Sequence, residues 1–140
     1  MTRFVITILL SSFLLFQVQP IIAKFILPWF GGAAAVWNAC VLFFQALLTG
    51  GYAYAHFVAG RLRPRQQAAV HVGLLVFSLA LIAAQALLWS APLLPGPGWK
   101  PVDGSAPIAR ILVLLLVSVG LPFFLLSTTS SLLQMWFSRA

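Results

Sequence analysis

The stretch FVITILLSSFLLFQVQPIIA, Phe4–Ala23, contains no charged side chain. Three more uncharged, mostly apolar stretches follow at Ala33–Val58, Gln66–Ala91 and Ile111–Leu126. A helix rises about 1.5 Å per residue, so about 20 such residues cross a hydrocarbon core of about 30 Å. The fourth stretch is shorter, but no charged residue follows it until Arg139. The pattern predicts an all-α membrane protein with four transmembrane helices.

The composition agrees with a lipid environment. The chain is 62% apolar and 6% charged, and its only acidic residue is Asp103, whereas about a quarter of a soluble domain is charged. The net charge of +7 comes from residues at the ends of the apolar stretches, where they meet lipid headgroups. A basic groove with interleaved aromatic residues is absent, so we expect the lipid bilayer, and no nucleic acid, as a partner.

We expect a single membrane domain, residues 1–140, folded as an antiparallel bundle. The helices are predicted at about 4–23, 33–58, 66–91 and 108–126. In the last helix, Pro122 removes a backbone hydrogen bond and clashes with the preceding turn, which predicts a kink there.

The segments between and after these helices have their own signals. Short interfacial segments are expected at about 24–30 and at about 132–137. The pair Gly31-Gly32 is expected to break the first of them. The hydroxyl cluster Ser127–Ser131 is expected either to end the fourth helix or to cap the second of these segments. The proline-rich stretch Ser90–Pro107 predicts ordered turns or extended chain.

The positive charges are unequally shared between the two faces of the membrane. One face carries Arg3, Arg61, Arg63, Arg65 and Arg139, and the other carries Lys24, Lys100 and Arg110. Because positive residues concentrate on the cytoplasmic side, we expect a bacterial-type cytoplasmic (inner) membrane protein with both termini in the cytoplasm.

Polar residues form a stripe on each of the two middle helices. In the first of these, Asn38, Gln45, Thr49, Tyr52 and His56 follow spacings of seven, four, three and four, which share one helix face. In the second, His71, Ser78 and Gln85 are spaced seven and seven. The short link makes the two helices antiparallel, so we expect the stripes to pair by depth into a polar seam. Ala46, Gly50 and Ala53 beside the first stripe would allow close backbone approach.

The seam has several interpretations. Interhelical hydrogen bonds that hold the helices together are the simplest interpretation, and the alternative is a module that binds or transports a small, polyamine-like molecule. His56 and His71 at one depth would suit a bis-histidine haem, the least favoured interpretation because the seam is tight. A second polar spot, Gln17, Gln19 and Lys24, lies near the outer end of the first helix, where Lys24 either reaches the headgroups or contacts an anion.

Catalytic constellations are missing from the sequence. No acid accompanies the membrane histidines and serines, no carboxylates are paired, and no nucleotide-binding glycine motif or metal-spaced Cys/His cluster occurs. We therefore expect neither enzymatic activity of this chain alone, nor a metal site, nor a cofactor.

Several motifs resemble one family. They are Phe16-Gln17-Val18-Gln19-Pro20, Lys24, Leu27-Pro28, Gly31-Gly32, Ala35-Val36-Trp37-Asn38, Phe43-Phe44-Gln45, Gly51-Tyr52-Ala53-Tyr54-Ala55-His56, Leu121-Pro122-Phe123-Phe124 and Ser127-Thr128-Thr129. Together they resemble the N-terminal membrane region of integral-membrane spermidine-synthase-like proteins, also described as fused major-facilitator/spermidine synthase proteins.

The resemblance implies a membrane module only. Family members continue with more helices and a soluble aminopropyltransferase-like domain, and no catalytic residue of that domain falls on this chain. The chain is then either a piece of a longer protein or a stand-alone relative. Our first hypothesis is a non-catalytic accessory subunit that packs against partner membrane helices or against a spermidine-synthase-like catalytic domain.

Overall fold

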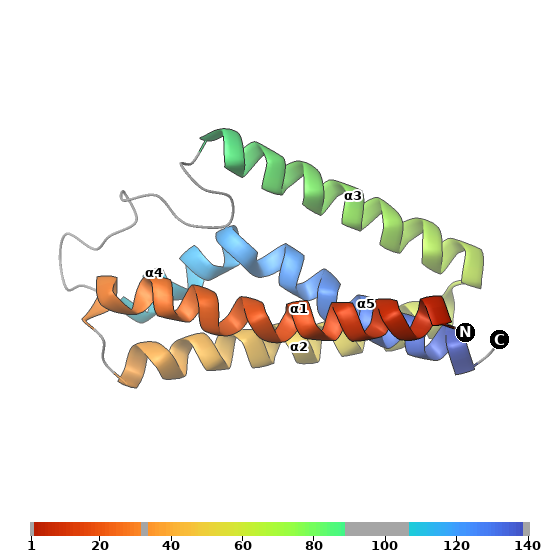
Figure 1. Ribbon diagram of the computed structural model, residues 1–140, viewed down its shortest axis with the longest axis horizontal. Coiled ribbons are helices and arrows are strands. Elements are labelled where there is room, and N and C mark those ends of the chain that lie inside the picture. Colours follow the sequence, from red (N-terminus) through yellow and green to blue (C-terminus); the bar gives the residue numbers. More distant parts are fainter. Residues whose placement is uncertain (1, 32–33, 89–106, 139–140) are drawn as a thin grey trace.

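The computed structural model describes residues 2–31, 34–88 and 107–138. Four helical segments are long and apolar enough to cross a membrane. They are α1 (Thr2–Ile26) with the 3-10 turn η1 (Leu27–Phe30), α2 (Ala34–Arg61), α3 (Pro64–Leu88), and a last crossing built from α4 (Pro107–Leu115), the π-helical segment η3 (Leu116–Gly120) and α5 (Leu121–Ser138) (Figure 1). The prediction of an all-α protein with four membrane-spanning helices is confirmed. The expected proline-rich loop lies, apart from Pro107, outside the described residues.

The first crossing ends at a glycine. α1 continues through Pro20 as far as Ile26, so only the end of the expected 24–30 segment leaves the α-helix, as η1. Gly31 then takes a left-handed backbone with φ of 82°, and its N–H donates to the Leu27 carbonyl. Glycine adopts this conformation without a steric penalty, which explains why the helix ends there.

The turn between α2 and α3 is two residues long, because α2 ends at Arg61 and α3 begins at Pro64. Proline suits the first helical position, where its missing N–H costs nothing. The Arg63 backbone N–H donates to Gln66 Oε1 at 3.0 Å, which satisfies a donor that the helix start leaves free.

The last crossing corrects one expectation. The hydroxyl cluster does not end a helix, and 132–137 is not a separate segment, because α5 runs unbroken from Leu121 to Ser138. The hydroxyls donate to carbonyls one turn back, as Ser127 Oγ does to Phe124 O at 2.7 Å and Thr129 Oγ1 to Leu125 O at 2.6 Å. Hydroxyls paired in this way are compatible with a helix interior.

Irregular backbone occurs just before Pro122. The widened turn at Leu116–Gly120 precedes the proline, whose missing N–H and bulky ring disturb the carbonyls of that turn. The kink at Pro122 itself stays a prediction.

α5 is the central element of the fold. In the most apolar 18-residue window of the last crossing, 56% of residues are buried, against 11% in α3. α1 and α2 pack against α5, and α3 contacts chiefly α5 while leaning away from α1 and α2 in Figure 1. The apolar core includes Ile26, Cys40, Leu115 and the Phe44–Phe123 pair, whose rings are 4.7 Å apart. The antiparallel bundle that we expected is not confirmed.

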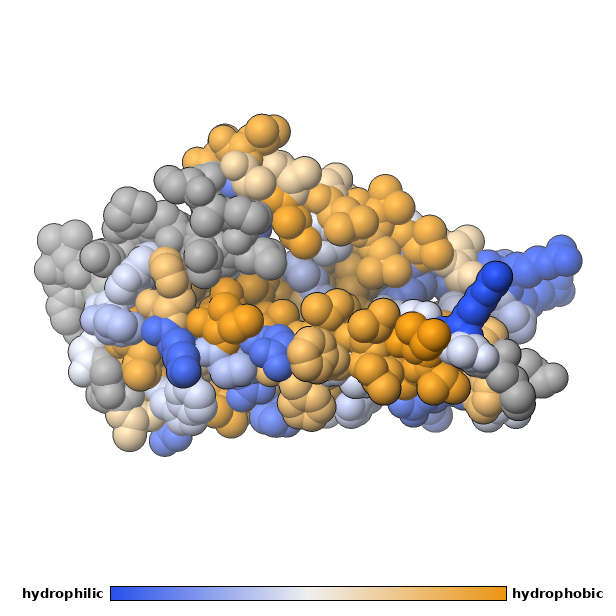
Figure 2. Space-filling model, viewed as in Figure 1, coloured by the Kyte–Doolittle hydropathy of each residue, from blue (hydrophilic) through white to orange (hydrophobic). Residues whose placement is uncertain are grey.

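The surface between the charged ends is largely apolar, apart from exposed polar residues such as those on α2. Figure 2 shows hydrophobic residues over α1 and α3, and hydrophilic residues gathered at the end that holds the N-terminus and the α2–α3 turn. The chain ends also meet there, since the Phe4 and Phe137 rings are 6.0 Å apart. Both ends of the described chain thus lie on one side, as four crossings require.

Candidate functional site

The two polar stripes do not face one another. On α3, His71 and Ser78 are buried and Gln85 is half-buried, and this stripe packs against the last crossing. His71 Nε2 lies 2.8 Å from Thr129 Oγ1, and Gln85 Nε2 donates to the Val117 carbonyl at 2.7 Å. All five stripe residues of α2 are instead exposed: Asn38, Gln45, Thr49, Tyr52 and His56. The prediction of a seam between α2 and α3 is wrong in its partner, because α5 takes the place of α2.

Backbone packing explains which face of α2 turns inward. A Cβ added at Gly51 would overlap the Ser127 hydroxyl and lie 3.1 Å from Ser127 Cβ, so any larger residue here would force α5 side chains to shift. A Cβ at Gly50 would lie 3.6 Å from a Phe124 ring atom, an ordinary contact. Ala46 and Ala53 are exposed. The close approach that we expected beside the polar stripe therefore occurs at Gly51, on a different face.

Hydrogen bonding orients His71. The Thr129 hydroxyl donates to the Leu125 carbonyl, so its oxygen accepts from His71 Nε2–H. The neutral imidazole then carries its proton on Nε2 and leaves Nδ1 as an acceptor, and Nδ1 has no hydrogen bond among the described residues. This chain of bonds links α3 to the centre of α5.

A second link joins three helix ends and was missed in the sequence. Gln67 is 1% exposed, and its Nε2 donates to the Leu62 carbonyl at 2.7 Å, just beyond the end of α2. Its Oε1 accepts from Trp136 Nε1 at 2.7 Å, near the end of α5. A polar residue in the first turn of a helix is usually interpreted as a capping residue, so this link could not be predicted from the sequence.

Gln85 hydrogen-bonds to the π-helical segment of the last crossing. A π-helical turn leaves one carbonyl without its usual helical donor, and such groups must be satisfied inside the membrane. The amide of Gln85 supplies a donor to Val117 O within that turn.

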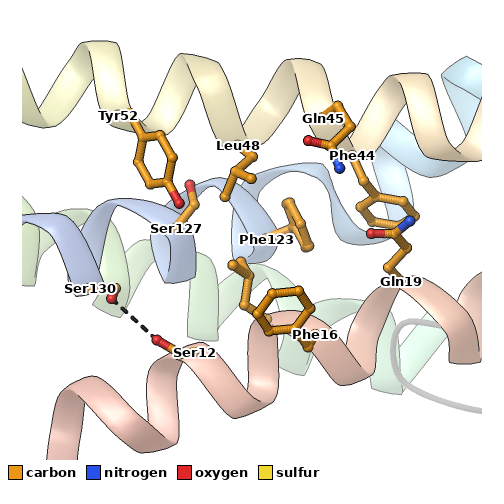
Figure 3. A pocket seen from close by; sticks show the side chains of 11 residues that line it. Ser12, Phe16, Gln19, Phe44, Gln45, Leu48, Tyr52, Phe123, Ser127 and Ser130 are labelled. Carbon is orange, nitrogen blue, oxygen red and sulfur yellow. Dashed lines mark hydrogen bonds between the residues drawn. The ribbon is translucent and has the colours of Figure 1, made fainter.

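One residue of the predicted outer polar spot, Gln19, and part of the α2 stripe meet in a cavity. It has a volume of about 110 Å³ and lies between α1, α2 and α5. The polar side chains that line it are Ser12, Gln19, Gln45, Tyr52, Ser127 and Ser130. Figure 3 shows the amides of Gln19 and Gln45 at one end and the hydroxyls at the other, with Phe16 and Phe123 between them. Ser12 Oγ and Ser130 Oγ are 3.3 Å apart.

The remaining predicted residues lie outside this cavity. Gln17 and Lys24 are exposed on α1. Thr49 Oγ1 donates to its own helix at Gln45 O, 2.9 Å away. His56 is exposed on α2 whereas His71 is buried against Thr129, so the two histidines are not brought together as a bis-histidine haem would require.

The chemistry available at these places is neutral hydrogen bonding. Amides, hydroxyls and one imidazole can orient a helix or a ligand, and the residues that line the cavity include no charged side chain. Within residues 2–31, 34–88 and 107–138, no group of three or more His, Cys, Asp or Glu side chains could hold a metal ion.

The comparisons with known proteins found no matching family model, no matching curated protein and no matching solved structure. The resemblance to spermidine-synthase-like proteins stays a prediction based on the quoted motifs.

Proposed function

We propose that this chain is a non-catalytic multi-pass membrane module that packs against partner membrane helices through the polar face of α2. One observation carries the proposal: the polar stripe of α2 is exposed, and Asn38, Thr49 and His56 lie outside the cavity described above. Asn38, Gln45, Thr49, Tyr52 and His56 are all exposed.

The position of the stripe in the membrane makes its exposure costly. α2 has 28 residues, and about 20 of them lie in the hydrocarbon core. Gln45 and Thr49 are close to the middle of the helix, and Asn38 and His56 lie towards its ends. Burying an amide in hydrocarbon without a hydrogen-bond partner costs roughly several kcal/mol of free energy. Polar residues at this depth therefore face protein or an aqueous cavity. A partner helix on α2 supplies the missing hydrogen bonds.

The charge distribution supports the orientation in a bacterial-type cytoplasmic membrane. Arg3, Arg61, Arg63 and Arg65 lie at the end of the molecule where the described chain begins and ends, and Lys24 and Arg110 lie at the other. The positive-inside rule places the arginine-rich end in the cytoplasm. The resemblance described above suggests, as one kind of partner, the further helices or catalytic domain of a spermidine-synthase-like protein.

Site-specific photo-crosslinking in native membranes tests the proposal. A photoreactive residue at Thr49 probes the stripe outside the cavity, and one at Val76, which is 61% exposed on α3, is the control on an apolar face. We expect a discrete protein adduct from Thr49 and lipid adducts from Val76. The adduct mass distinguishes a second copy of this chain from another protein.

Lipid adducts at both positions, or protein adducts of equal yield at both, would contradict the proposal. Either result would mean that α2 has no preferred protein neighbour. A crosslink specific to Val76 would instead place the partner on α3.

A further inference from the structure

We infer that the cavity between α1, α2 and α5 is a binding site for a small, neutral, lipid-soluble molecule that consists of one ring and one polar group. This inference goes beyond the partner proposed above: the cavity shares Gln45 and Tyr52 with the α2 stripe, whereas Asn38, Thr49 and His56 lie outside it. It rests on the cavity's size, its opening, its lack of charge and its unused hydrogen-bonding groups.

The size suits one ring rather than one water molecule. The volume is about 110 Å³, whereas a water molecule occupies about 30 Å³ and an enclosed cavity of about 150 Å³ holds benzene. The flat faces of Phe16, Phe44 and Phe123 supply apolar walls. A single six-membered ring that projects partly from the opening fits this space.

The cavity opens on the surface of the membrane-spanning helices. Among the lining residues, Phe16 is 74% exposed, Tyr52 is 50% exposed and Gln45 is also exposed. All three lie within membrane-spanning helices. A ligand therefore reaches the cavity from the bilayer, which selects molecules that partition into lipid.

The lining selects for neutral molecules. No charged side chain lines the cavity, and an ion without a counter-charge in a low-dielectric site pays a large desolvation cost. This argues against the polyamine-like ligand that the sequence left open, at least at this place in the fold.

Several lining groups have hydrogen-bonding capacity left over. Ser12 and Ser130 pair with each other, and Ser127 donates to its own helix. The amides of Gln19 and Gln45 make no side-chain hydrogen bond among the described residues, and each offers both donors and an acceptor. The ligand's polar head thus meets the amide end, and its ring lies against the phenylalanines.

Three molecules of one shape test the inference on the unmodified chain in detergent. They are benzyl alcohol, which is neutral and polar, ethylbenzene, which is apolar, and benzylammonium, which is charged. The readout is the NMR shift of the side-chain amides, with Gln17 as an internal control, because it is exposed two residues from Gln19 and does not line the cavity. A saturable shift at Gln19 and Gln45 reports binding, whereas partition into micelles gives a linear shift at all three.

We expect benzyl alcohol to saturate the shifts of Gln19 and Gln45 and to bind about fivefold to tenfold more tightly than the other two, the value of one hydrogen bond. Gln45→Leu should lower the affinity for benzyl alcohol to that for ethylbenzene, and Gln17→Leu should leave the affinity for benzyl alcohol unchanged. If Gln45→Leu does not fold, the three-ligand series decides alone.

Other outcomes would overturn the inference. Shifts that never saturate would show that the cavity holds water or lipid only. Equal affinity for ethylbenzene would show that the polar lining is not used, and tightest binding of benzylammonium would show that the site is not selective for neutral molecules.

Discussion

The hydroxyl-rich centre of α5 and the polar stripe of α2 carry similar side chains in opposite environments. On α5, Ser127 and Thr128 are buried, and their hydroxyls are bonded to the helix itself. On α2, the amides and the imidazole are exposed. Periodicity in a membrane helix therefore identifies a polar face but not the neighbour of that face. The two regions should respond differently to mutation, and four predictions test this.

The largest effect is expected at the α2–α5 contact. Gly51→Ala forces a methyl group against Ser127, and overpacking of this kind costs about 1–3 kcal/mol. Gly50→Ala is the matched control, since its Cβ finds ordinary contact distances and alanine favours the helix by up to about 1 kcal/mol. Thermal unfolding in detergent, followed by circular dichroism, measures both. Equal midpoints for the two variants would show that α2 and α5 do not approach closely.

The next effect is expected where three helix ends meet. Gln67→Leu removes the bonds to Leu62 O and Trp136 Nε1 and leaves buried groups unpaired, which should cost about 1–2 kcal/mol. Gln66→Leu removes only the exposed bond from the Arg63 N–H, so it should cost clearly less in the same unfolding assay. A larger loss from Gln66→Leu would place Gln67 outside the interface.

A smaller coupling is expected between α3 and α5. The variants His71→Phe and Thr129→Val, with their double mutant, isolate the bond of 2.8 Å between these side chains. Interhelical bonds of this kind in membranes average about 0.6 kcal/mol, and we expect a coupling energy of that size. A coupling energy indistinguishable from zero would mean that the two residues do not interact.

The smallest effect is expected on the α2 stripe. Asn38→Leu and His56→Phe should change the unfolding free energy of the isolated chain by less than about 0.5 kcal/mol, because neither side chain is buried. The same variants should reduce the crosslinking yield at Thr49 in native membranes. A large loss of stability in detergent would show that the stripe packs inside the chain and would reverse the comparison.

Part of the candidate site could be predicted from residue spacing alone. The stripe His71, Ser78 and Gln85 was expected to face protein, and the structure buries two of its members and hydrogen-bonds two of them to the last crossing. The helix against which this stripe packs could not be predicted, because a short turn makes two helices neighbours in sequence but does not require them to pack together. The links of Gln67 to Trp136 and of Ser12 to Ser130 were missed for the same reason, since each joins residues far apart in the chain.

The sequence by itself determined the solvent and the number of crossings, because a long uncharged apolar helix is stable only where lipid replaces water. It also indicated a break at the Gly31-Gly32 pair, although α1 runs beyond its predicted end at Ala23 to Ile26. Only the tertiary structure decided that α5 is central and that the polar face of α2 turns outward. The physical reason is that lipid and protein interiors are similarly apolar, so close backbone contact at Gly51, rather than hydrophobicity, selects which helix faces meet.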